Sequence, residues 1–211
     1  MRLFDEINDL SEYEIIDIDI YFDEMELHEG EKEKRKEFSE RMVDIMIFIF
    51  ALFSVMRQYN SVNKQFIISQ LQSRYSELVL QYMDIDKLVD DYIQKFSEEI
   101  VDTTLKYPGE EYYLSNERAT LIGVNEANSI LGYRQLQEAK EKGYTRKTWI
   151  TEGDKKVRET HREVDMQEIP LFDYFVVGNS LMLFPHDNLS EYGRYAEEKE
   201  IAGCRCTVQY S

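Results

Sequence analysis

Apolar residues recur at steps of three and four along the first half of the chain. Between residues 38 and 56 the recurring positions are Phe38, Met42, Ile45, Met46, Ile49, Phe53 and Met56. This spacing puts all of them on one face of an α-helix. The same pattern continues over residues 62–82 and 85–100. The sequence therefore predicts three consecutive helices, each of which buries one face in a shared core.

The stretch 106–109, Lys-Tyr-Pro-Gly, combines a helix terminator with turn residues and ends this helical region. Ser115 or Asn116 is a suitable N-cap for a fourth helix that runs to about Lys140. Gly143 is placed to end that helix. We expect the segment after this helix to have a different secondary structure.

Beyond Gly143 the segments become short and rich in aromatic and β-branched residues. Strands are predicted at 148–150, 174–177, 181–184 and 206–210. The predicted class is α+β, with a helical N-terminal region followed by a compact α+β domain. In that domain we expect a small antiparallel sheet to pack against the fourth helix.

The acidic residues are concentrated near the N-terminus. The chain has a formal charge of −17, and residues 1–40 hold 15 acidic and 5 basic side chains. Residues 13–21 partly alternate apolar and acidic side chains, which favours a half-buried strand or an extended partner-binding segment. A solvated acidic terminus without a partner is the alternative. We predict an acidic arm over 1–40, a helical region over 41–107 and an α+β domain over 115–211.

Composition and motifs exclude several classes of protein. A chain this acidic is repelled by phosphate backbones over most of its surface, so it does not wrap DNA without regard to sequence. The most apolar stretch, 45–56, is too short to span a bilayer, and we expect no membrane association. Two cysteines cannot form a disulfide framework. The chain has no phosphate-binding glycine loop, no GxSxG elbow and no HExxH helix.

A group of polar residues in the last 65 positions is the main candidate for chemistry. Asp154, Arg158 and His161 are spaced i, i+4 and i+7, so they share one face if residues 155–163 are helical. Such a face most often holds a structural network of ion pairs and hydrogen bonds. A histidine acting as a general base is the alternative.

Cys204 and Cys206 are separated by one residue, which places both thiols on the same face of a strand. Together with His161 and His186 they would complete a metal site of two cysteines and two histidines. The alternative is a pair of buried, unreactive thiols that pack as small hydrophobes. Arg205, on the opposite face, would then pair with a carboxylate across the sheet.

An ordered string of residues is more specific than any of these motifs. It comprises Arg118-Ala119-x-x-Ile122, Asn125-Glu126-Ala127, Gly143, Lys147-x-Trp149, Asp154-x-x-Val157-Arg158-x-x-His161, Pro185-x-Asp187 and Gly203-Cys204-Arg205-Cys206. Over residues 115–211 this string resembles the C-terminal domain of the phage Mu protein F-like family of head morphogenesis proteins. Two positions depart from the family pattern. Met166 stands where the family often has glycine, and Gly203 where it often has asparagine.

The resemblance implies a minor capsid protein of a phage or prophage, carried in the virion head and present in the bacterial cytoplasm during assembly. It implies binding to the portal or another capsid or scaffold protein, assistance with DNA packaging or delivery, and no cofactor. Trp149, Asp154, Arg158, His161, Pro185, Asp187, Cys204, Arg205 and Cys206 would be its structural or binding residues. The competing hypothesis is a metal- or thiol-dependent enzyme that uses Arg158, His161 and the two cysteines.

DNA contact would have to use the nearly balanced C-terminal domain, where basic residues concentrate. They are Lys140, Lys142, Arg146, Lys147, Lys155, Lys156, Arg158 and Arg162.

Overall fold

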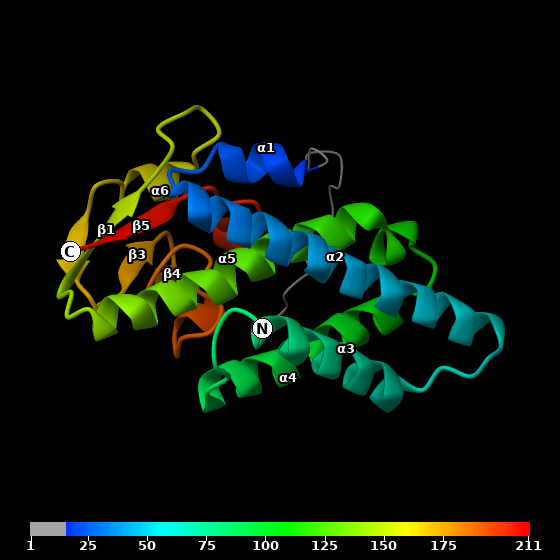
Figure 1. The fold of residues 1–211 in the computed structure, drawn as a ribbon. Helices are drawn as coiled ribbons and strands as arrows, with labels where there is room; N and C mark the ends of the chain where they lie inside the picture. Colours follow the sequence, from blue (N-terminus) through cyan, green and yellow to red (C-terminus); the bar gives the residue numbers. More distant parts are fainter. Residues whose placement is uncertain (1–15) are drawn as a thin grey trace. The chain divides into compact units, whose positions relative to one another are not determined.

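The computed structural model describes residues 16–211 (Figure 1). The chain forms two compact units: the helical unit, residues 38–123, and the C-terminal unit, which combines residues 17–37 with residues 124–211. Helices α2 (Glu29–Gln58) and α5 (Asn116–Glu141) each contribute residues to both units. The α+β class predicted from the sequence is confirmed.

The helical unit consists of the larger part of α2, then α3 (Lys64–Val79), α4 (Lys87–Lys106), the short 3-10 helix η2 (Glu111–Leu114) and the first turns of α5. The predicted cap at Ser115 is present, because its hydroxyl accepts a hydrogen bond from the Arg118 amide. The Asp86 side chain caps α4 in the same way by accepting from the Val89 amide. Five of the seven periodic apolar residues are buried as expected: Phe38, Met42, Met46, Ile49 and Phe53. The other two, Ile45 and Met56, are half-buried.

A fully buried arginine lies in the core of the helical unit. The Arg118 guanidinium donates to the Thr104 hydroxyl at 2.8 Å and to the Tyr113 carbonyl at 2.7 Å. It also lies 4.9 Å from the centre of the Tyr113 ring. A buried charge is tolerated only where hydrogen bonds and aromatic faces replace its hydration. Arg118 therefore fixes the start of α5 against the end of α4.

The C-terminal unit contains two small antiparallel sheets. The first has the strand order β2-β1-β5 and consists of Glu168–Pro170, Arg146–Ile150 and Thr207–Tyr210. The central strand β1 follows α5 in the chain and pairs with β5, with Trp149 opposite Val208. The second is the hairpin of β3 (Phe175–Val177) and β4 (Ser180–Met182), with a turn at residues 178–179.

The expectation of a strand or an extended segment at residues 13–21 is wrong where the structure describes it. Residues Ile18–Asp23 form helix α1, and the Asp17 carboxylate caps it by accepting from the Ile20 amide. Tyr21 and Phe22 are buried, and the Tyr21 hydroxyl donates to the carbonyl of Cys204. This part of the acidic arm therefore belongs to the core of the C-terminal unit. Residues 1–15 lie outside the described part of the chain.

Candidate functional site

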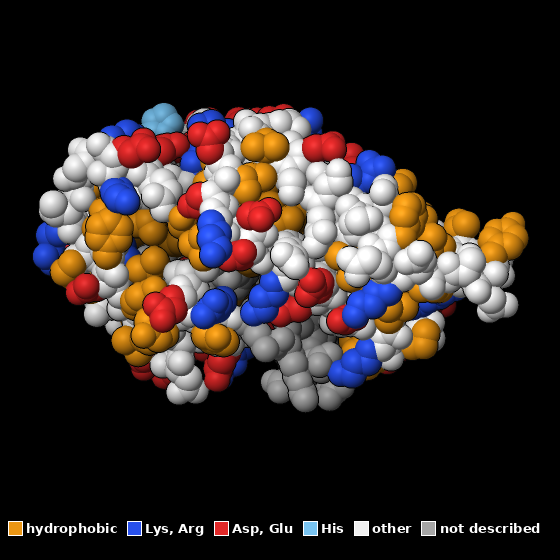
Figure 2. Space-filling view, turned by 90° about the horizontal axis from the view of Figure 1, so that it is seen from below, with side chains coloured by type: hydrophobic (Ala, Val, Ile, Leu, Met, Phe, Trp, Pro, Cys, Tyr) orange, Lys and Arg blue, Asp and Glu red, His pale blue; other side chains and the backbone are white. Residues whose placement is uncertain are grey.

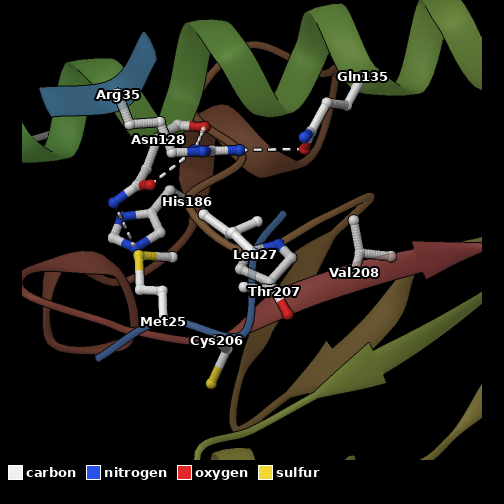
Figure 3. Close-up of a pocket in the computed structure, with 10 residues that line it drawn as sticks. Met25, Leu27, Arg35, Asn128, Gln135, His186, Cys206, Thr207 and Val208 are labelled. Atoms are coloured by element: carbon white, nitrogen blue, oxygen red, sulfur yellow. Dashed lines mark hydrogen bonds between the residues drawn. The ribbon is translucent and has the colours of Figure 1, made fainter. Parts of the chain in front are cut away.

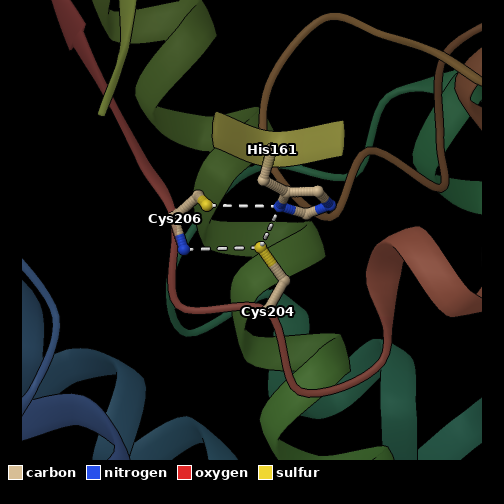
Figure 4. A group of neighbouring side chains, drawn as sticks. All are labelled: His161, Cys204 and Cys206. Atoms are coloured by element: carbon tan, nitrogen blue, oxygen red, sulfur yellow. Dashed lines mark hydrogen bonds between the residues drawn. The ribbon is translucent and has the colours of Figure 1, made fainter. Parts of the chain in front are cut away.

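Four buried side chains in the C-terminal unit form a continuous polar chain: Glu200, His161, Cys204 and Cys206. Figure 4 shows the last three of them. His161 Nδ1 lies 3.3 Å from Cys206 Sγ and 3.4 Å from Cys204 Sγ. On the other side of the ring, His161 Nε2 lies 3.2 Å from Glu200 Oε2. All four residues are at most 4% exposed. The order of contacts is thus carboxylate, imidazole and two sulfurs.

Short local structures position these groups. His161 lies on the single-turn helix α6 (Glu159–Arg162), and Glu200 lies on the similarly short α7 (Glu198–Ile201). The Thr160 hydroxyl also donates to Glu200 Oε2, at 2.7 Å. Gly178 has a φ of +57°, and a Cβ at this position would lie 2.8 Å from Glu200 Oε1. A side chain at residue 178 would therefore displace the carboxylate.

The two thiols are electrostatically unequal. Burial raises the pKa of the Cys204 thiol, but interactions with Cys206, His161 and His186 outweigh burial and hold this pKa well below the ordinary value. The hydrogen bond to the Cys204 sulfur, followed by burial, raises the pKa of Cys206. The Cys206 amide also donates to Cys204 Sγ at 3.3 Å. Cys204 is therefore the more acidic thiol of the pair.

The predicted helix over residues 155–163 is wrong, and with it the shared face of Asp154, Arg158 and His161. Arg158 has extended backbone angles and only precedes α6. Asp154 accepts a hydrogen bond from the Lys156 amide at 2.9 Å, which folds residues 154–156 into a turn. The Arg158 guanidinium donates to the carbonyl of Ala202, so it binds the chain before the cysteines rather than a carboxylate.

Cys204, Arg205 and Cys206 lie just before β5 and not within it, although both thiols are buried as expected. Arg205 points away from the cysteines and binds two carboxylates. Its guanidinium donates to Glu24 at 2.8 Å and to both oxygens of Asp154, at 2.8 and 2.7 Å. Hydrogen bonds from Arg205 hold the pKa of Asp154 below its usual value against the opposing effect of burial. The expected pairing of Arg205 is present, but its partners lie outside the sheet.

Pro185 and Asp187 belong to a buried turn after β4. The Asp187 carboxylate accepts from the amides of Leu183, Leu189 and Ser190 and from the Ser190 hydroxyl. Burial nevertheless raises the pKa of Asp187. Gly193 packs directly on this carboxylate, where any Cβ would collide with it. Asp187 is therefore a structural centre of the turn.

His186 is not part of the cysteine cluster, so the four-ligand set of two cysteines and two histidines does not form. Its Nε2 lies 2.6 Å from the carbonyl oxygen of Cys204, to which it donates. His186 lines a small hollow with Arg35 and Asn128 (Figure 3). Arg35 donates to Asn128 Oδ1 at 2.6 Å, and burial lowers the pKa of Arg35 to about 10. The hollow encloses about 10 Å³, enough for one water molecule.

β1 supplies two further buried residues. Trp149 is fully buried and meets His161 edge-on, with ring centres 5.7 Å apart, so it forms one wall of the cluster. Lys147 is also fully buried, and its amine has no hydrogen-bond partner among the described residues. It lies 5.3 Å from the centre of the Phe175 ring. Lys147 therefore cannot bind a DNA phosphate, so the prediction that it contributes to DNA contact is wrong.

Met166 adopts a φ of +59°. This left-handed conformation is one that glycine adopts without strain. The turn is fixed by Asp165, whose carboxylate accepts from the Thr151 amide at 2.9 Å, and by the Met166 amide, which donates to the Trp149 carbonyl at 2.9 Å. The backbone at this position therefore has a conformation that favours glycine.

Two of these residues were missed by sequence reasoning. Glu200 sits in the run Glu-Glu-Lys-Glu at 197–200, which has the composition of an exposed surface. Lys147 was noted as part of the family string and as a candidate for DNA contact, but its burial was not predicted. Its position two residues before Trp149 on one strand was the available signal, since residues i and i+2 face the same way.

The arrangement offers three chemical possibilities: a metal centre, an activated thiol or a structural network.

Comparison of the chain with models of known protein families, with curated proteins and with solved structures finds no match. No helix in the described part of the chain combines the length and apolar character needed to cross a membrane.

Proposed function

We propose that this chain is a minor head protein of a phage or prophage, without enzymatic activity, that binds the portal or another capsid or scaffold protein. The protein would be part of the phage head and would assist DNA packaging or delivery. It would be present in the bacterial cytoplasm during assembly. The proposal combines the resemblance of residues 115–211 to the Mu protein F-like domain with the roles of the resembling residues in the fold.

One observation carries the proposal: the residues of the resembling string, far apart in sequence, hold a single structural network together. Arg158 binds the carbonyl of Ala202, His161 contacts both cysteines, and Arg205 binds Asp154. Asp187 organises its own turn. A string that specifies a domain is expected to behave in this way. The left-handed backbone at Met166 supports the same interpretation.

The burial of the cluster argues against the enzyme hypothesis. A nucleophilic thiol must reach its substrate, whereas Cys204 and Cys206 are 3% and 4% exposed. The hollow beside Cys206 has room for one water and none for a substrate. A structural role accounts for the same contacts without requiring an opening.

The acidic segment 17–37, which belongs to the C-terminal unit, is our candidate for the surface that binds the partner. Some of its carboxylates are used internally, since Asp19 and Asp23 pair with Lys36, and Glu24 pairs with Arg205. Glu29 and Glu33, one turn apart on α2, are exposed. Such groups favour a basic partner, because complementary charge speeds and orients association.

The described surface favours a protein partner over DNA. Of the eight basic residues that could have contacted DNA, Lys147 is buried and Arg158 binds the chain itself. The face drawn in Figure 2 mixes acidic, basic and hydrophobic side chains and gathers no broad basic area. A phosphate backbone requires a continuous basic track.

The experiment is co-expression of the chain with the portal protein encoded in the same genome, followed by co-purification and size-exclusion chromatography. We expect a stable complex that weakens as salt rises. The double variant Glu29→Gln/Glu33→Gln should weaken the complex, whereas the matched variant Glu141→Gln/Glu191→Gln, which removes two exposed charges elsewhere, should not.

Absence of a complex with the portal and with every other head protein of that genome would overturn the proposal. Equal weakening by the two double variants would show that net charge, rather than the α2 surface, drives binding.

A further inference from the structure

The cysteine cluster has the dimensions of a zinc site. A tetrahedral Zn²⁺ with Zn–S bonds of about 2.3 Å and a Zn–N bond of about 2.05 Å holds the nitrogen about 3.5 Å from each sulfur. The two distances observed between His161 Nδ1 and the sulfurs are 3.3 and 3.4 Å. The three ligand atoms all lie within 4.8 Å of one another. One ion could therefore contact all three with little rearrangement.

The imidazole is oriented as a metal ligand. The Glu200 carboxylate accepts from the Nε2–H of His161, and this leaves the lone pair of Nδ1 pointing at the sulfurs. Histidines that bind metals usually donate their second N–H to a carboxylate or carbonyl in this way. Thr160 and Gly178 keep that carboxylate in place. Simple packing of two thiols against a ring does not require a buried carboxylate on the far side.

The surroundings of the sulfurs also favour binding of a cation. The Cys206 amide donates to Cys204 Sγ at 3.3 Å, an N–H···S contact that favours negative charge on the sulfur. The cysteines are free rather than joined in a disulfide. Two thiolates and one imidazole form a soft donor set, which suits Zn²⁺ better than Mg²⁺ or Ca²⁺.

We propose that His161 Nδ1, Cys204 Sγ and Cys206 Sγ bind one Zn²⁺ ion, with Glu200 as the positioning residue and a water molecule as the fourth ligand. The ion would tie α6 to the segment before β5, two parts of the chain about 40 residues apart. It would thereby hold the C-terminal unit together, a role independent of the identity of any binding partner.

The test is metal analysis of the full chain, purified without chelators, exposed to Zn²⁺ and then dialysed. We expect about one zinc per chain in the wild type and a loss of bound zinc in Cys204→Ser, Cys206→Ser and His161→Asn. His28→Asn, at an exposed histidine, is the matched control, and His186→Asn should also keep the metal. Glu200→Gln should lower zinc affinity about 10- to 100-fold without abolishing it.

Two measurements on the wild type avoid reliance on variants that fail to fold. Co²⁺ in place of zinc should give thiolate-to-metal charge-transfer absorption, and added chelator should increase the rate at which a thiol reagent labels the protein. Absence of bound zinc in wild type that is folded by circular dichroism would overturn the proposal. Loss of zinc in His186→Asn as complete as in His161→Asn would overturn the three-ligand assignment.

Discussion

The buried amine of Lys147 is expected to destabilise the folded protein at neutral pH. Lys147 is fully buried on the inner side of β1, and its amine has no hydrogen-bond partner in residues 16–211. Burial lowers the pKa of this amine from 10.5 to about 8, although Asp187 and Asp173 act in the opposite direction. The folded state thus holds the proton less tightly than the unfolded state does.

The magnitude follows from this pKa difference. Each pKa unit corresponds to about 1.36 kcal/mol, so a change from 10.5 to about 8 corresponds to about 3.4 kcal/mol. Lys147→Met keeps the apolar stem and removes the amine. We expect this variant to raise the free energy of unfolding at pH 7 by about 1 to 3 kcal/mol, since the contact with Phe175 offsets part of the gain.

The pH dependence has a defined sign. Below pH 8 the amine is protonated in both states and the full penalty applies. Between pH 8 and 10.5 the unfolded state binds more protons than the folded state, so wild-type stability gains with rising pH relative to the variant. The advantage of Lys147→Met should therefore shrink across this window.

Urea unfolding of both proteins at pH 7 and pH 10 measures the effect, and Lys155→Met, at an exposed lysine, is the control. A Lys147→Met variant that is less stable than wild type at pH 7 would refute the reasoning. So would an advantage that stays constant as the pH rises.

Four further predictions concern stability, each measured by the shift in the denaturation midpoint. Arg118→Met should cost about 2 to 4 kcal/mol, because the variant loses a buried charged donor and leaves its acceptors unpaired. Gly193→Ala should cost about 1 to 3 kcal/mol or more, since its Cβ collides with Asp187. Phe22→Ala should cost about 3 to 5 kcal/mol, a loss that contradicts any view of residues 17–30 as dispensable for folding. Met166→Gly should be neutral or stabilising by up to about 1 kcal/mol, because Met166 is 68% exposed and its φ is +59°; a clear loss would show that its side chain matters.

The helices were the most predictable part of the fold. The periodic apolar residues from Phe38 to Phe53 and caps such as Asp86 are local signals, and they correctly predicted that α2, α3 and α4 exist. The apolar pattern did not reveal that α2 already begins at Glu29, because its first turns are rich in charged residues. The exception is α1. Its acidic residues are exposed and its two buried aromatic residues are adjacent, so the short segment carries no helical period that a reader could detect.

The candidate site was predictable in its members but not in its geometry. Cys204, Cys206 and His161 were identified by residue type, yet their meeting depends on a contact across about 40 residues, which spacing does not encode. The i, i+4 argument failed because Asp154 bonds to the amide two residues ahead and so ends any helix before it starts. Glu200 was missed because a glutamate in a run of charged residues is expected to be exposed to solvent, whereas this one is buried.

The discontinuous make-up of the C-terminal unit sets the order in which the protein folds during synthesis. Residues 38–123 leave the ribosome together and can form the helical unit at once, whereas residues 17–37 must wait for their partners in residues 124–211. The Tyr21 hydroxyl, for example, binds a carbonyl 183 positions further along the chain. Until residues 124–211 have been made, Phe22 and Met25 lack the core that buries them in the folded unit, so their apolar side chains stay exposed on the nascent chain.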